Sequence, residues 1–402
     1  MLSALIILVT AAITAYLTFS KRLAGSSDWK ATVTPLASIM GSGFLISAPL
    51  LAGIVGKLAV LCMAALLALA YAVGSVIRFN IRHFEPIENA GHGAAQDIGF
   101  LSRAVLAGAY FISVTYYLQL LAAFVLNAAG IHDRLLANVV TTAVLLVIGS
   151  VGMWRGLDKL EQVETHAISL NLGMIGALLV ALAVHNVGLA LDGAWQLPAI
   201  ASGIDLHDTR VLLGLLIVVQ GFETSRYLGD EHGAEQRIRT MRTAQLVSAA
   251  IYLLFIGLAT VMFHDGLGAD VTAITQLVAP LALVLPVLLS VTAIGSQFSA
   301  AVADTAGAGG LLEDITNHRL PVRYAYLIIL LITVALTWGT HVNAIIAYAS
   351  RAFALFYLLQ CMVAFLVAWQ KKDLPRRMAR LGFFALVGMA CLLVFAFGLP
   401  AE

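Results

Sequence analysis

The stretch of residues 34–54, TPLASIMGSGFLISAPLLAGI, decides the fold. It is apolar and as long as a membrane-spanning helix, which needs about 20 residues, yet Gly41-Ser42-Gly43 stands at its centre. Unwound backbone at mid-membrane depth is tolerated only where it lines a cavity or is buried in protein. Interrupted helices of this kind form the substrate sites of secondary transporters. The alternative is a patch of small residues that lets two helices pack closely.

The composition is that of a protein with many membrane spans. Of the 402 residues, 61% are hydrophobic and only 11% are charged, and the mean hydropathy is +0.94. These values exclude an ordinary soluble domain. The net charge of +1 also argues against a nucleic-acid partner, which requires a basic surface. Cys62, Cys361 and Cys391 lie in apolar segments without metal-ligand spacing, so we predict neither a metal site nor a cofactor.

Apolar windows of about 20 residues predict twelve membrane spans. They lie at residues 1–20, 32–55, 57–80, 100–129, 134–154, 163–187, 209–228, 243–264, 276–308, 323–340, 342–369 and 380–399. The first window has no basic residue in front of its apolar core. We therefore interpret it as a retained helix and not as a signal peptide.

Lysine and arginine set the orientation of these spans. Lys57, Arg134 and Arg210 fall in one set of alternate loops, and Arg351 falls within a span. Every other lysine and arginine falls in or beside the opposite set of loops. Cytoplasmic loops are enriched in basic residues, so this richer set is predicted to be cytoplasmic and both termini external. We expect a multi-pass protein of the cytoplasmic (inner) membrane, surrounded by the lipid bilayer, with its oligomeric state left open.

A second predicted span, residues 212–229 (LLGLLIVVQGFETSRYLG), is also interrupted, at QGFETS. It comes five spans after the first interrupted one. An odd number of spans per half gives the two halves opposite orientations across the membrane, as in transporters built from inverted repeats. We therefore predict an all-α membrane protein with a peripheral helix at 1–20, five-helix repeats at 32–187 and 209–369, and a last helix at 380–399.

Three stretches resemble the amino acid–polyamine–organocation (APC) superfamily of transporters, whose fold is of the LeuT type. The motif GSGF at 41–44 is similar to the break in the family's first core helix. The run GFETSRYLGDEHGAEQRIRTMRTAQLVSAAIYLLF at 221–255 is similar to its sixth and seventh helices. The run VTAIGSQFSAAVADTAGAGGLLEDITNHRLPVRYAYL at 291–327 is similar to its eighth helix and the entry to the ninth. The resemblance implies a LeuT-type 5+5 inverted-repeat core with one added N-terminal and one added C-terminal helix. Family members usually have twelve helices and both termini in the cytoplasm.

The resemblance implies a secondary active transporter of a small amine-containing organic solute, with an amino acid as the leading case, that works by alternating access. An inorganic cation carried by the same fold is the alternative. A channel is disfavoured because no pore loop is repeated. An enzyme is not expected, because the sequence shows neither a nucleophile triad nor a cluster with metal-ligand spacing. The GxxxxGK[ST] motif of ATP-driven pumps is absent as well.

The two interruptions supply most of the candidate substrate-binding residues. These are Ser38, Gly41, Ser42, Gly43, Phe44, Tyr110, Tyr117, Gln220, Gly221, Phe222, Glu223 and Thr224. A half-helix that starts at the first break presents free N–H groups to an anion such as a substrate carboxylate. Glu223 lies near mid-membrane, where an ionisable residue is a functional hypothesis by default, and it could bind an amine or carry a proton. The alternative is a structural pair with Arg351 at similar depth, which would also serve gating.

The sequence leaves open the roles of two tyrosines and one acidic residue. Tyr110 and Tyr117 share one face of the predicted span 100–129, where they act either as an aromatic lid over the site or as ordinary packing. Asp304 falls near the predicted cytoplasmic end of the span 276–308, and there it is an interfacial residue.

A coupling ion is expected at a separate group of residues. The resemblance places Asn171 where proton-coupled family members carry a lysine, whose amine stands in for a bound sodium ion. With asparagine there, either a cation fills the gap or no coupling ion binds. Candidate cation ligands are the carbonyls of Ala37 and Met40 and the hydroxyls of Ser296 and Ser299, because hard cations prefer oxygen. The alternative is that both serines bond back to their own helix. The possible coupling ions are thus H+ at Glu223 or Na+ at this second group.

Overall fold

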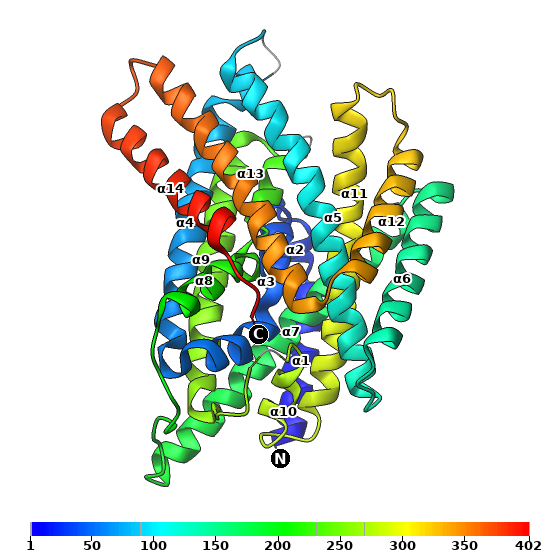
Figure 1. Cartoon of the computed structure of the whole chain (residues 1–402). Coiled ribbons are helices and arrows are strands. Elements are labelled where there is room, and N and C mark those ends of the chain that lie inside the picture. Colours follow the sequence, from blue (N-terminus) through cyan, green and yellow to red (C-terminus); the bar gives the residue numbers. More distant parts are fainter. Residues whose placement is uncertain (1, 89–90, 230, 269, 402) are drawn as a thin grey trace.

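The computed structural model describes residues 2–88, 91–229, 231–268 and 270–401, apart from the side chains of residues 24, 42, 155 and 158–166. The regular structure of these residues is helical throughout (Figure 1). The α-helices are α1 (Leu2–Phe19), α2 (Lys21–Ala24), α3 (Ser27–Val55), α4 (Ala59–His83), α5 (Ala94–Ala128), α6 (Arg134–Arg155), α7 (Asp158–Leu191), α8 (Leu206–Gly214), α9 (Ala234–Ala259), α10 (Ala273–Val278), α11 (Leu285–Ile315), α12 (Val322–Gly339), α13 (Val342–Gln370) and α14 (Arg377–Phe397). Short 3-10 helices are η1 (Gly56–Leu58), η2 (Glu85–Ile87), η3 (Leu216–Val219), η4 (Phe222–Tyr227) and η5 (Thr260–Met262).

The chain is a multi-pass membrane protein. Ten helical stretches of the described residues are long and apolar enough to cross a membrane. One of them, Ser27–His83, has 57 residues and contains both α3 and α4. The predicted span 209–228 is not among the ten, because its residues form α8, η3 and η4 in succession and no single helix. The difference from the twelve predicted spans therefore lies in one merged pair and one broken segment.

The prediction for residues 276–308 was wrong at both ends. The residues at its start belong to the short helix α10 and a turn, and α11 begins at Leu285 and continues to Ile315. Pro280 lies just after α10. Proline lacks a backbone N–H and disfavours helical geometry in the residue before it, which ends the helix there. The longer α11 moves Asp304 away from a helix end, to roughly 16 Å before the last residue at the helical rise.

The helices pack around a central group formed by α3, α5, α11 and α13. Helix α5 packs against both α11 and α13, while α3 packs against α9, η3 and η4. Helix α12 lies against α6, α14 lies against α13, and α1 lies against α7. Figure 1 shows the connections α11–α12 and α13–α14 at its upper end, and the N-terminus and the segment between α7 and α8 at its lower end. The arginine-rich loops thus lie at one end of the molecule.

The break in α3 occurs at Gly43, whose backbone is not helical (φ 176°, ψ 11°). A Cβ atom at this position would lie 2.7 Å from Val218 Cα of η3, so only glycine allows the two segments to touch. The break deprives carbonyls of helical partners, and each needs another donor inside a membrane. Tyr252 Oη lies within hydrogen-bond reach of the carbonyls of Ile39 (3.1 Å) and Val218, and Gln297 Nε2 donates to Gly41 O at 3.0 Å.

The second break is held by a serine and a glycine. Ser350 Oγ of α13 accepts from Ile217 N at 2.9 Å and donates to Gly214 O at 2.6 Å, which joins the end of α8 to η3. Gly221 has φ +114°, a left-handed conformation that favours glycine, and its Cβ would lie 2.5 Å from Ser38 Oγ. Both broken segments therefore meet at mid-molecule with their backbones in close contact.

Candidate functional site

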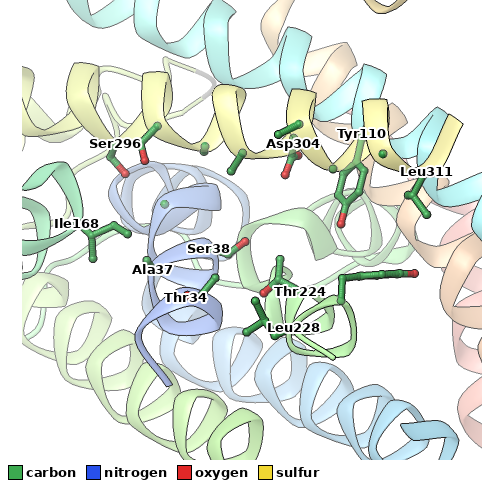
Figure 2. A pocket seen from close by; sticks show the side chains of 18 of the residues that line it. Thr34, Ala37, Ser38, Tyr110, Ile168, Thr224, Leu228, Ser296, Asp304 and Leu311 are labelled. Carbon is green, nitrogen blue, oxygen red and sulfur yellow. The ribbon is translucent and has the colours of Figure 1, made fainter. Parts of the chain in front are cut away.

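A cavity of about 620 Å³ lies beside the two breaks and is walled by α3, α5, α7, η4 and α11. Its lining residues are Thr34, Ala37, Ser38, Gly41, Tyr110, Ile168, Asn171, Leu172, Thr224, Tyr227, Leu228, Ser296, Ser299, Ala300, Ala303, Asp304, Ala306, Gly307, Gly310, Leu311 and Asp314. Figure 2 shows Ser38, Thr224 and Asp304 reaching into this space from three different elements. The wall is assembled from segments far apart in the sequence.

The cavity opens at the arginine-rich end of the molecule. Asp314, in the last turn of α11, lines the cavity and has a side chain that is 55% exposed. Along α3 the lining begins at Thr34 and ends at Gly41, and the apolar residues that follow, Phe44, Leu45 and Ile46, are all buried. The described wall is therefore open at one end and packed at the level of the breaks.

Eight residues singled out from the sequence do lie on the cavity wall. They are Ala37, Ser38, Gly41, Tyr110, Asn171, Thr224, Ser296 and Ser299. The wall of described residues does not include Met40, Gly43, Phe44, Tyr117, Gln220, Gly221, Phe222 or Glu223. These eight are packed behind it, and the side chain of Ser42 lies outside the described part of the structure.

The residues behind the wall contact the neighbouring segments instead of facing the cavity. Phe44 packs on the rings of Tyr252 and Phe255, with centroids 5.3 and 4.4 Å away. Gln220 donates through Nε2 to Tyr117 Oη at 3.2 Å, which ties the second break to α5. The sequence could not separate these roles, because a residue at a break can face either the cavity or the neighbouring segment.

Glu223 is buried beside the second break and is 1% exposed. Its Oε2 atom accepts hydrogen bonds from Tyr357 Oη at 2.9 Å and from Gly221 N at 3.0 Å. The ring of Phe222 stacks on Tyr357 with centroids 5.5 Å apart. Among the described residues, Glu223 forms no salt bridge. The carboxyl is therefore sealed from the cavity in this conformation by the residues of its own segment.

The hypothesis that Arg351 pairs with Glu223 was wrong. Arg351 Nε donates to Phe395 O at 2.8 Å, and its guanidinium lies 5.9 Å from the centre of the Phe395 ring. Arg351 of α13 and Phe395 of α14 therefore contact each other between these two helices. Similar depth in the membrane suggested a pair, but Arg351 bonds to Phe395 of α14 whereas Glu223 bonds to Tyr357 of α13 and to Gly221.

Asp304 lines the cavity, whereas the sequence had indicated an interfacial residue. It does so although its residue is only 8% exposed, and Ser113 Oγ of α5 donates a hydrogen bond to its Oδ2 atom. Tyr110, one turn before Ser113, lines the same wall (Figure 2). A signal was present, because Asp304 is followed by the uncharged run TAGAGGLL before Glu313. An ionisable residue inside an apolar run deserves the functional interpretation first.

The group proposed for a coupling cation is partly assembled. Asn171 Nδ2 of α7 donates to Ser296 Oγ of α11 at 3.3 Å. Gly41 lies close by, since a Cβ there would be 3.2 Å from Ser296 Oγ. Asn171 thus contacts Ser296, which lies next to the first break. This is the position where the family resemblance led us to expect either a cation or no coupling ion.

Ion pairs surround the open end of the cavity. Arg103 of α5 binds Asp314 at 2.6 Å and Glu88 at 3.8 Å, and Arg226 of η4 binds Glu88 at 3.0 Å. Arg237 of α9 binds Glu85 at 2.8 Å. These pairs connect elements on both sides of the opening, so they fix the width of the mouth.

Comparison with known proteins decides the family. A family model described as an APC superfamily transporter matches residues 21–398. The chain belongs to the APC superfamily of transporters. It is also 44% identical over 353 residues to an uncharacterized protein of Aquifex aeolicus (strain VF5). The aligned region covers 86% of this chain and 85% of the Aquifex protein. The resemblance seen in the sequence is therefore confirmed, and the protein is a transporter and not an enzyme.

Solved structures share the fold of this APC transporter. Two crystal structures of mutant forms of a manganese transporter from Eremococcus coleocola have a TM-score of 0.60 to it. They are 14% identical in sequence, and each match covers 92% of this chain and 87% of that chain. At this identity the similarity shows the fold alone.

Helix α1 stands apart from the cavity in this APC transporter. The family match starts after it, at residue 21. It packs on α7 through small residues: a Cβ on Gly173 would lie 2.2 Å from Thr14 Oγ1, and one on Gly176 would lie 2.5 Å from Ile13 Cδ1. None of the described residues of α1 lines the cavity. It is an added helix at the periphery of the site.

Proposed function

We propose that this protein is a secondary active transporter of a small amine-containing organic solute, with an amino acid as the leading case. The observation that carries the proposal is the charge of the cavity wall. Among the described lining residues, the side chains that can carry a full charge at neutral pH are the two acidic ones, Asp304 and Asp314. A cavity with acidic groups and low-dielectric walls concentrates cations. The remaining polar groups are hydroxyls and an amide, which suit hydrogen bonds to a small organic solute.

Asp304 is the group proposed to bind the amine. Its carboxyl lies at the inner part of the cavity, whereas Asp314 is engaged with Arg103 at the mouth. A charge-assisted hydrogen bond between an ammonium group and a carboxylate is about twice as strong as a neutral one. The solute carboxylate, if present, would face the backbone N–H groups near the break in α3.

Transport by alternating access follows if the chain is built from the inverted repeats 32–187 and 209–369. In such repeats the two breaks, at Gly43 and Gly221, would lie in corresponding helices, and their close approach at mid-molecule supports this arrangement. With the arginine-rich end in the cytoplasm, the opening at Asp314 faces inward. The described conformation would then be the inward-open state, and closing the mouth while opening the far side would complete the cycle.

The driving force is proposed to come from a proton on Glu223. The carboxyl is enclosed next to the break, so any change in its protonation acts directly on η4 and Gly221. Sodium at Ala37, Met40, Ser296 and Ser299 is the competing source. Against it, Asn171 already donates a hydrogen bond to Ser296, so one of the two lone pairs of this hydroxyl is taken.

An inorganic cation is the second candidate substrate. The structural neighbours are described as a manganese transporter, and the acidic cavity would attract such an ion too. However, the described residues contain no group of three or more His, Cys, Asp or Glu side chains able to hold a metal ion. Manganese also takes carbonyl and water oxygens as ligands. We place the organic amine first because the rest of the polar wall consists of hydroxyls and an amide.

Thermal unfolding of the purified full-length protein tests both candidates. The probes are the common amino acids, primary amines and Mn²⁺, each with and without Na⁺. A bound solute raises the apparent stability by RT ln(1 + [L]/Kd). We expect amines to raise the Tm of the wild type, and Asp304→Asn to weaken their binding by roughly tenfold or more, the worth of one charge-assisted hydrogen bond.

The matched control is Asp192→Asn, which removes one carboxylate from an exposed position at the opposite end of the molecule. It should bind amines as the wild type does. Stabilisation by Mn²⁺ alone would support the inorganic-cation candidate instead. Amine binding that is unchanged in Asp304→Asn would remove Asp304 from the site.

A further inference from the structure

A second cavity, of about 680 Å³, lies between α4, α9 and α14 at the arginine-rich end, separate from the solute cavity. Five arginines line it: Arg78, Arg82, Arg239, Arg242 and Arg380. Glu235 is the one acidic residue among its described lining residues. We call these five side chains and the space between them the arginine pocket.

The acidic residues nearby neutralise only part of this charge. Arg82 is paired with Glu235, and Arg239 is paired with Asp28 at 2.6 Å. The other three arginines, Arg78, Arg242 and Arg380, form no salt bridge with any described residue. The arginine pocket therefore retains positive charge that the protein itself does not balance.

Arg78 is the unusual member of the set, because its residue is only 9% exposed. Its guanidinium donates to Gln245 Oε1 at 2.5 Å and to Ser75 Oγ at 2.8 Å, both neutral acceptors. Gln245 is fixed in turn by a bond from Nε2 to Ala70 O at 2.8 Å. A buried charge is normally paired with an opposite charge. A guanidinium that is buried, oriented and unpaired indicates a site for an anion.

Aromatic rings form much of the rest of the wall. The Arg78 guanidinium lies 4.9 Å from the centre of the Tyr71 ring, and that of Arg380 lies 5.6 Å from the centre of the Phe79 ring. Phe383 and Phe384 of α14 complete the wall. Further along α14, Leu386 is 70% exposed, as expected for a helix in contact with lipid. The pocket thus combines a cationic head region with an apolar border.

We propose that the arginine pocket binds the phosphate group of an anionic phospholipid from the leaflet at this end of the molecule. Guanidinium groups bind phosphate oxygens in pairs of parallel hydrogen bonds. Basic pockets between membrane helices on the cytoplasmic side are known to take lipid head groups. A lipid is favoured over free phosphate because the aromatic border would contact the glycerol and acyl parts of the same molecule.

Native mass spectrometry of the full-length protein, released from detergent and titrated with phosphatidylglycerol, tests the proposal. Phosphatidylcholine and sodium phosphate serve as comparison probes. The main variant is Arg242→Gln/Arg380→Gln, which removes two arginines without touching the buried Arg78. We expect its affinity for phosphatidylglycerol to fall roughly thirtyfold, because each arginine near an anionic lipid raises the affinity about fivefold. Arg78→Gln should lower it further in any fraction that folds.

The control is Arg319→Gln/Arg323→Gln, the same change of charge at two exposed arginines of the same end, one in the connection after α11 and the other in the first turn of α12. Its affinity should equal that of the wild type. An equal loss of phosphatidylglycerol affinity in both double variants would show that only the net charge matters, and it would overturn the proposed site. Binding of phosphatidylcholine as tight as that of phosphatidylglycerol would overturn the phosphate recognition. If the pocket binds free phosphate but no phospholipid, and Arg242→Gln/Arg380→Gln abolishes that binding, the ligand is phosphate and the assignment to a lipid is overturned.

Discussion

Ser113 of α5 donates a hydrogen bond to Asp304 of α11, and this contact orients the carboxyl that faces the solute cavity. Ser113 is fully buried, so this bond holds the carboxyl of Asp304 against α5. The two helices pack along their length, which brings a serine and an aspartate 191 residues apart into one site.

Loss of this contact should weaken solute binding. In Ser113→Ala, Asp304 loses one hydrogen bond and its fixed orientation, so we expect affinity for the amine found in the thermal-shift screen to fall roughly tenfold. Isothermal titration calorimetry measures the change. Ser248→Ala is the control, because Ser248 is equally buried but bonds only to Gln245 O of its own helix at 3.0 Å. Equal affinities in Ser113→Ala and the wild type would show that Ser113 does not position Asp304.

Gly43 should prove essential for folding, because a side chain there meets Val218 and not the cavity. We expect Gly43→Ala to cost about 1–3 kcal/mol, the usual penalty of overpacking, and Gly43→Leu to prevent folding. The readout is the Tm of detergent-purified protein with its monodisperse yield. Gly257→Ala is the control, since its Cβ would meet nothing within 4 Å. A stable, well-expressed Gly43→Leu protein would contradict the close approach of the two breaks.

Glu223→Gln tests proton coupling. The glutamine keeps a hydrogen-bond acceptor for Tyr357 and Gly221 but cannot gain or lose a proton. In proteoliposomes we expect this variant to exchange solute at a rate within about threefold of the wild type, yet to accumulate none under an imposed pH gradient. Sodium-driven accumulation that persists in Glu223→Gln and disappears in Ser296→Ala would instead assign coupling to the cation site.

The orientation can be checked with single cysteines in a protein that lacks Cys62, Cys361 and Cys391. Ala199 and Lys372 are both exposed and lie at opposite ends of the molecule. A membrane-impermeant maleimide added to intact cells should label Ala199→Cys and leave Lys372→Cys unmodified until the cells are opened. The reverse pattern would place the arginine-rich end outside, and the open cavity with it.

Much of this protein was determined by its sequence alone. The apolar spans and the one-sided distribution of lysine and arginine indicated a multi-pass membrane protein, because a bilayer admits only long apolar helices and retains basic loops on one side. The glycines at 43 and 221 marked both breaks, since an interrupted helix in a membrane needs residues that allow close backbone contact. The order of the motifs also predicted the APC superfamily, which the family match confirmed.

The tertiary structure decided which residues face the cavity. Sequence shows how deep a residue lies in a span but not which side of its helix meets the cavity. Glu223 and Arg351 share a depth, yet one bonds to Tyr357 and the other to Phe395. Asp304 became a site residue only because α11 extends to Ile315 and packs against Ser113 of α5. Packing between segments that are far apart in the sequence determines which residues become partners. The local sequence around each residue does not predict these contacts.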